Sequence, residues 1–183
     1  MVAPQSERHP WQDDSSAPEM PPGLVLPCGP LDAKSWTEAL YELEGALAQL
    51  MEALDAYLVV NVTRHDDIFV QYHTSSLGAI TAETAATRRC SSNCMTRHLV
   101  GDYEAGQLRT LGWKAPNLDP LQTAIPGSGH PNFYRTWSTD NGWPPALFSD
   151  LTVRTLYEVW HLGPRDCTMR SAALPAGLAP GNH

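Results

Sequence analysis

Apolar residues recur at helical spacing in one long segment near the start of the chain. The steps between successive members are four, three, four, three and four residues, which is the period of an amphipathic helix. Ser35 stands at the N-cap position and Glu38 follows three residues later, a pattern typical of a capping box. So narrow a seam favours packing on a sheet, with a partner helix as the alternative. The apolar positions are Trp36, Leu40, Leu43, Leu47, Leu50 and Leu54.

Three extended runs follow this helix. Residues 57–63 and 68–73 are rich in β-branched and aromatic side chains, and the polar stretch His65-Asp66-Asp67 between them is typical of a turn. The two runs are therefore expected to form an antiparallel hairpin. A third run, residues 77–85, alternates less sharply, so we expect it at the edge of the sheet, where backbone groups lie open.

The second half of the chain is less regular. Asp102 is expected to cap a short helix that ends at Gly112. Residues 114–143 hold several prolines and glycines, which indicates loops or short extended pieces. A last helix is predicted over residues 144–160, where a proline pair suits the first turn and apolar residues on more than one face indicate packing on two sides. This order predicts an α+β domain, with an antiparallel sheet of three or more strands packed by an N-terminal and a C-terminal helix.

Proline content sets the expected bounds of this domain. Residues 1–34 hold seven of the 16 prolines and are predicted to be a disordered arm. Residues 171–183 are rich in alanine, proline and glycine and are predicted to be a disordered tail, which leaves a single domain over residues 35–170.

Charge and hydropathy exclude some classes of partner. The formal net charge is −8 and no basic face is visible, so a nucleic-acid partner is not expected. No apolar run is long enough to cross a membrane and no secretory signal is visible, so we expect a cytoplasmic protein without a membrane partner.

Chemistry-bearing motifs are few. Cys90, Cys94 and His98 would share one helical face and are residue types that bind zinc, but a fourth ligand is missing, so a zinc protein is a remote alternative. The four cysteines are unevenly spaced and are expected to be free thiols. Neither a phosphate-binding loop nor a nucleophile elbow occurs, so we predict no cofactor and no enzymatic activity.

Large aromatic residues gather in the irregular segment. On loops such residues either fill the core or anchor a binding groove, and both roles stay open here. The positions are Trp113, Phe133, Tyr134, Trp137 and Trp143.

Several short motifs occur in a familiar order. After the Trp-led helix and the strand pair come Ala82-Glu83, then Leu111-Gly112-Trp113-x-x-Pro116, then Asn132-Phe133-Tyr134-x-x-Trp137. Over residues 36–164 the chain resembles the actinobacterial TY-Chap group, which is related to type III secretion chaperones and YbjN-like proteins. The resemblance implies a secretion-chaperone-like α+β fold, often paired as a dimer, and a peptide- or protein-binding role without catalysis.

An edge strand together with this resemblance predicts that the chain captures an extended partner segment by strand addition. The acidic charge would favour basic or apolar clients. The alternative is a scaffold or small regulatory protein that self-associates through the seam of the first helix. The predicted peptide-contacting residues are Phe69, Tyr72, Trp113, Phe133 and Trp137.

Overall fold

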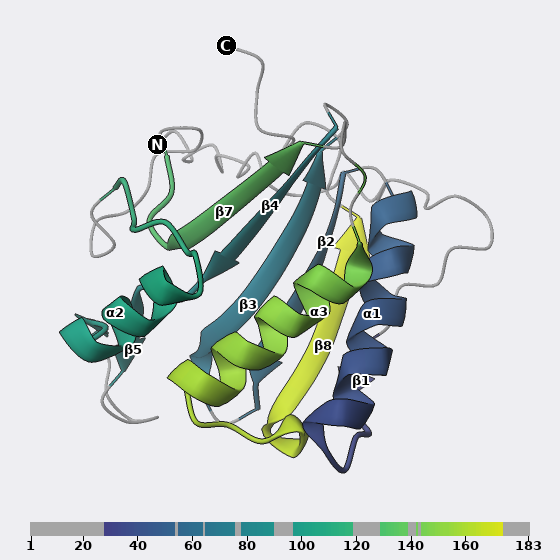
Figure 1. Ribbon diagram of the computed structural model, residues 1–183, viewed down its shortest axis with the longest axis horizontal. Coiled ribbons are helices and arrows are strands. Elements are labelled where there is room, and N and C mark those ends of the chain that lie inside the picture. Colours follow the sequence, from purple (N-terminus) through teal and green to yellow (C-terminus); the bar gives the residue numbers. More distant parts are fainter. Residues whose placement is uncertain are drawn as a thin grey trace, which may run out of the picture.

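A six-stranded sheet and three α-helices form the described part of the chain in the computed structural model (Figure 1). The structure describes residues 28–53, 55–63, 65–75, 78–89, 97–118, 129–138, 142 and 144–173. The helices are α1 (Trp36–Glu52), α2 (Asp102–Thr110) and α3 (Pro145–Arg154), which continues into the π-helical turn η2 (Thr155–Val159). The strands of the sheet are β1 (Gly29–Pro30), β2 (Ala56–Val62), β3 (His65–Ser75), β4 (Ala79–Thr84), β7 (Phe133–Ser138) and β8 (Cys167–Ala173), and β5 (Thr87–Arg89) pairs with β6 (Arg97–Leu99) separately.

Neighbouring strands of the sheet are antiparallel, in the order β1-β8-β2-β3-β4-β7. Helices α1 and α3 lie side by side across one face (Figure 1). The predicted α+β class and the packing of helices on an antiparallel sheet are confirmed. The edge assignment was wrong, because β4, the third predicted strand, lies between β3 and β7. The edge position belongs to β7, from the segment expected as loops or short extended pieces.

Side-chain alternation determines which face of the sheet the helices cover. Leu58, Val60, Val70, Tyr72 and Ile80 are completely buried beneath the helices. Their immediate neighbours along the strands point to the opposite face, where most are half-buried. Among the described helices, none lies on that second face (Figure 1).

The hairpin between β2 and β3 forms as predicted, but its turn was misplaced. His65 pairs with Val62, so the stretch from His65 to Asp67 belongs to β3 and is not the turn. The register then shifts, because the next pair is Asn61 with Phe69. The extra residues are on β3 and form a bulge. Bulges are common at sheet edges and strand ends, and here the bulge keeps the polar stretch within the strand.

Strand β8 was not predicted, although it pairs with the whole of β2, from Ala56–Ala173 to Val62–Cys167. The sheet therefore continues three residues beyond the domain end predicted at residue 170. On its other side β8 pairs with β1, and Leu31 is 2% exposed, so the fold also includes residues placed in the predicted arm. Residues 1–27 and 174–183, which make up most of the predicted arm and tail, lie outside the described residues.

Helix α1 begins as its sequence predicts. The Ser35 hydroxyl accepts a hydrogen bond from the Glu38 amide at 3.3 Å, while the Glu38 carboxylate accepts one from the Lys34 amide at 2.7 Å. Leu43 and Leu47 are completely buried against the sheet and α3, which confirms packing within the monomer. The middle of the seam, Leu43, Leu47 and Leu50, therefore lies in the core of the monomer. No helix in the described part of the chain is long and apolar enough to span a membrane.

Helix α2 begins one residue earlier than expected, since Gly101 is the N-cap and Asp102 lies in the first turn without capping. The last helix packs on two sides as predicted, with α3 against α1 and η2 against α2. Ten of its residues, Pro145–Arg154, form an α-helix as predicted, but the turn that follows, Thr155–Val159, is a π-helix.

Tyr72 joins the sheet to α3. Its hydroxyl donates to the Phe148 carbonyl at 2.9 Å and lies 2.9 Å from the Thr152 hydroxyl, while its ring meets the Phe148 ring edge-on at 5.6 Å. Complete burial raises the pKa of Tyr72, so the group stays a neutral donor throughout the ordinary pH range.

Replacing Tyr72 by phenylalanine should lower the free energy of unfolding by about 1 to 2 kcal/mol, because the buried hydroxyl bonds are lost and the ring volume is kept. Urea unfolding would measure the change. Tyr41→Phe is the matched control, since Tyr41 is 74% exposed on α1 and its substitution should change stability by less than about 0.5 kcal/mol. Equal stability of the two variants would contradict the assigned role.

Candidate functional site

Three of the five predicted contact residues lie inside the core. Tyr72, Trp113 and Phe133 are 0%, 2% and 3% exposed. The Trp113 indole N–H donates to the Thr155 hydroxyl at 3.0 Å, which ties the segment after α2 to η2. For Trp113 and Phe133 the structure thus shows core filling, one of the two roles left open for the aromatic cluster.

The other two residues are partly buried, but they lie on opposite faces of the sheet. Trp137 shares the helix-covered face with Tyr72, and its ring meets the Phe148 ring edge-on at 4.8 Å. The Arg135 guanidinium lies 4.8 Å from the centroid of the Trp137 ring. Phe69 points to the opposite face because side chains alternate along β3. The five predicted residues therefore do not form one surface.

The outer side of β7 is partly open. Near its start, Tyr134 forms an isolated bridge with Lys114, with hydrogen bonds of 2.8 and 3.0 Å between their backbones. Backbone groups alternate in direction along a strand, so Thr136 directs its N–H and C=O to the same outer side as Tyr134. Within the described residues, nothing pairs with the backbone of Thr136 on that side. This position is an accessible point on the sheet edge.

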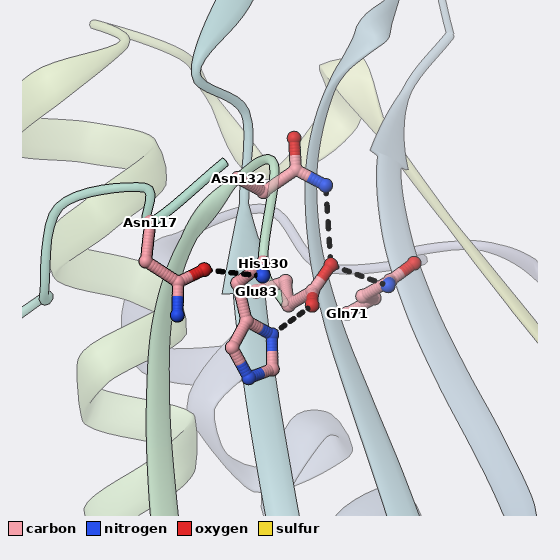
Figure 2. Close-up of polar contacts among 5 residues, drawn as sticks. All are labelled: Gln71, Glu83, Asn117, His130 and Asn132. Atoms are coloured by element: carbon pink, nitrogen blue, oxygen red, sulfur yellow. Dashed lines mark hydrogen bonds and ion pairs between the residues drawn. The ribbon is translucent and has the colours of Figure 1, made fainter. Parts of the chain in front are cut away.

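A polar cluster centred on Glu83 lies on the second face of the sheet, beside β7 (Figure 2). The Glu83 side chain is 16% exposed, and one carboxylate oxygen lies 2.8 Å from His130 Nδ1. The other oxygen accepts from the amides of Gln71 and Asn132 at 3.2 and 3.1 Å. Three partners meet the hydrogen-bonding needs of this half-buried carboxylate, and the carboxylate in turn holds their three side chains together.

The cluster fixes the segment that leads into β7. The His130 ring stacks on the Tyr134 ring with 4.0 Å between centroids and 16° between planes. The backbone N–H of His130 donates to the Asn117 side chain. Because Tyr134 is also the partner of Lys114, Glu83 positions the start of the edge strand through His130.

Sequence reasoning did not identify Glu83 and His130 as partners. Glu83 lies in the third predicted strand, and His130 lies in the segment 114–143, which was expected to form loops or short extended pieces. The local signal was a charged residue inside an alternating strand, which needs polar partners when neighbouring strands cover it. Those partners come from β3 and from a segment 47 residues further on, so only the sheet order identifies them.

Metal and thiol chemistry has little support among the described residues. No three His, Cys, Asp or Glu side chains there are placed to hold a metal ion. Of the zinc candidates, His98 is exposed on β6, while Cys90 and Cys94 lie outside the described residues. Cys28 and Cys167 are free, and burial raises the pKa of Cys167 to about 12, so its thiol stays protonated at neutral pH.

These features define a class of protein. It is an α+β domain in which helices cover one face of an antiparallel sheet and the edge strand, β7, has backbone groups without a partner strand within the described residues. Over residues 32–168 the sequence matches the family described as TY-Chap3, T3SS (YopN, CesT) and YbjN peptide-binding chaperone 3. The chain belongs to this family of chaperone-type binding domains, which confirms the TY-Chap resemblance. Neither a curated protein nor a solved structure matches the chain significantly.

Glu83→Ala should lower the free energy of unfolding by about 2 kcal/mol, because the partly buried amides of Gln71 and Asn132 and the His130 ring lose their shared acceptor. Thermal and urea unfolding would measure the loss. Glu42→Ala serves as the control, since Glu42 is exposed on α1 and should change stability by less than about 0.5 kcal/mol. A Glu83→Ala protein as stable as the control would show that the cluster does not hold this region.

Proposed function

We propose that this chain is a non-catalytic, chaperone-like domain that captures an extended segment of another polypeptide at the β7 edge. Membership of a peptide-binding chaperone family supports the general role. The observation that carries the specific proposal is the outward backbone of Thr136, beyond the Lys114 bridge. An extended peptide pairs with such groups by strand addition, which requires no chemistry from the receptor.

Side chains on both sides of the edge would provide selection. Alternate residues of an added strand contact opposite faces of the sheet. On one face they would meet Trp137 and Arg135, and on the other Tyr134. Trp137 thus keeps its predicted contact role, whereas Phe69 lies two strands from β7 and outside this proposed surface.

The buried members of the predicted set would act indirectly. Tyr72, Trp113 and Phe133 pack beneath β7 and its neighbours, so they keep the edge rigid and need not touch the client. A rigid edge lowers the ordering cost of binding. The formal net charge of −8 would favour basic or apolar client segments and disfavour acidic ones.

A second copy of the chain is the competing occupant of the edge. Two β7 strands could pair in an antiparallel manner across a two-fold axis, which would form the expected homodimer. The cytoplasmic location and the dimer both stay predictions. Light scattering alongside the binding assay would separate these cases, because a peptide that replaces a β7 partner converts dimers to monomers.

A proline at position 136 tests capture at the edge. Proline removes the outward N–H but breaks no bond to β4, since edge strands tolerate proline on their open side. A peptide array probed with the full chain would identify extended ligands, and fluorescence anisotropy would measure their affinity. We expect Thr136→Pro to weaken binding about tenfold, equivalent to the loss of one or two backbone hydrogen bonds.

Thr136→Val is the matched control, because it changes the same exposed side chain and leaves the backbone donor intact. It should bind peptides as the unmodified chain does. An array without extended ligands, or ligands that bind the proline variant at full affinity, would refute capture at β7.

A further inference from the structure

The motif after α2 and the motif along β7 meet at one side chain, Arg135. Its guanidinium donates from Nη1 to the Leu111 carbonyl at 3.3 Å, and its central carbon lies 4.8 Å from the centroid of the Trp137 ring. Figure 1 shows the chain after α2 passing the start of β7, where the Lys114 bridge also forms. These contacts hold a half-buried cation on the helix-covered side of β7, next to the open backbone of Thr136.

Gly112 makes room for this cation. Its φ of +88° lies in the left-handed region that favours glycine. A Cβ atom added there would lie 3.0 Å from Nη1 and 3.3 Å from the central carbon of the Arg135 guanidinium. Glycine is therefore required twice at this position, once for the turn that ends α2 and once for the close approach of the guanidinium. Gly112 is a positioning residue for Arg135.

The Arg135 guanidinium has donors to spare. Within the described residues, the Leu111 carbonyl is its hydrogen-bond acceptor, and no Asp or Glu side chain forms an ion pair with it. A guanidinium carries several N–H donors in a planar fork, so most of them are left for a ligand. Partial burial strengthens a bond between this fork and an oxyanion, because less water competes for either group. Among the groups of a polypeptide, a carboxylate fits such a fork best.

The charge beside the β7 edge differs from the net charge of the chain. The edge carries two cations, Arg135 and the exposed Lys114, whose ammonium lies 5.7 Å from the centroid of the Tyr134 ring. Glu83 lies on the second face and is bound to three partners. The net charge of −8 is spread over the whole chain and is screened beyond about 8 Å at physiological ionic strength. At contact distance, Arg135 therefore determines the charge on the helix-covered side of the edge.

We propose that Arg135 is the specificity residue of the β7 edge and binds the side-chain carboxylate of an Asp or Glu in the captured segment. This assignment rests on the capture function proposed above. A client residue that pairs with Thr136 directs its side chain to the second face, so its two neighbours point to the side of Arg135. One of these neighbours lies opposite Trp137, about 5 Å away between Cβ atoms, and the guanidinium lies over that ring. The favoured client is thus an apolar extended segment with a single carboxylate, and not a strongly acidic one.

Titration of the ¹⁵N-labelled full chain with the peptide acetyl-Thr-Val-Glu-Val-Thr-amide tests this assignment. The peptide favours an extended backbone and carries a single carboxylate. We expect amide shifts in β7 and in residues 111–114 that saturate in the millimolar range. The Gln analogue has the same shape without the charge and should bind about tenfold more weakly, and the Lys analogue more weakly still. Equal affinities of the Glu and Gln peptides would overturn the assignment.

Arg135→Gln separates recognition of the carboxylate from a structural role. If Arg135 binds the carboxylate, the Glu and Gln peptides should have equal affinities for this variant, whereas a purely structural role would weaken both by the same factor. Arg135→Lys keeps the charge without the planar fork and should retain only part of the preference. Arg109→Gln is the matched control, because Arg109 is exposed in the last turn of α2 and its loss should leave the tenfold preference intact. A tenfold preference that persists in Arg135→Gln would refute the proposal.

A pair of glycine variants tests the positioning of the guanidinium. Gly112→Ala should displace the guanidinium and reduce the preference for the Glu peptide, because the added Cβ takes its place beside the backbone. Gly142→Ala is the control, since Gly142 also has a positive φ, +66°, but has nothing within 4 Å of an added Cβ. It bears the same kind of backbone strain and should keep the full preference. Equal preferences in the two variants would contradict the role given to Gly112.

These measurements distinguish the failure of this inference from the failure of capture. If the Glu and Gln peptides bind equally and Thr136→Pro weakens both, the Arg135 assignment fails and capture at β7 stands. If the preference depends on Arg135 but Thr136→Pro leaves both affinities unchanged, edge capture fails and the carboxylate site stands.

Discussion

The alternation of side chains along the central strands is the constraint on which the rest of the structure depends. Every second side chain is buried along β2 and along residues 70–74 of β3, so one face of the sheet must be covered by apolar helix surface. Helices α1 and α3 cover that face, and the Tyr72 hydroxyl joins it to α3 by a buried hydrogen bond. Because both long helices pack on the same side, the described part of the chain has little left with which to close the sheet beyond β7.

The residues that stabilise the fold differ from those that are available to contact a partner. The buried aromatics Tyr72, Trp113 and Phe133 hold the layers together. The Glu83 cluster then holds the segment that precedes the edge strand, using polar bonds on the second face where no described helix packs. A strand fixed in this way can leave its outer backbone open without losing its register.

Local patterns were predictable from the sequence, and long-range pairing was not. The period of α1 and the composition of β2 and β3 gave their positions, because each signal lies within a few consecutive residues. Strand β8 follows a proline and lacks a clear alternation of apolar and polar residues, and it becomes a strand because β1 and β2 pair with it on both sides. The error over His65–Asp67 arose because polar residues favour turns, while a bulge allowed them to stay in β3.

The candidate site was harder to predict than the fold for the same reason. Loop aromatics were expected to be either core or contact residues, and only the positions of α3 and η2 show that Trp113 and Phe133 are core. Placing the edge at β4 followed from its weaker alternation, but β7, which begins 49 residues after Thr84, pairs with β4 and takes the edge position. The Glu83–His130 pair has no short sequence motif, since its two residues come from separate segments of the chain.

The pairing of β1 with β8 brings two segments far apart in the sequence together at one side of the sheet. Gly29 lies opposite Met169, only four residues before Ala173, so the first and last described strands are neighbours at one margin of the sheet. The β7 edge is at the other margin. A circularly permuted protein that joins these neighbouring ends through a short linker should therefore keep its layers, and a label or fused domain attached there would stand away from the strand that receives the client.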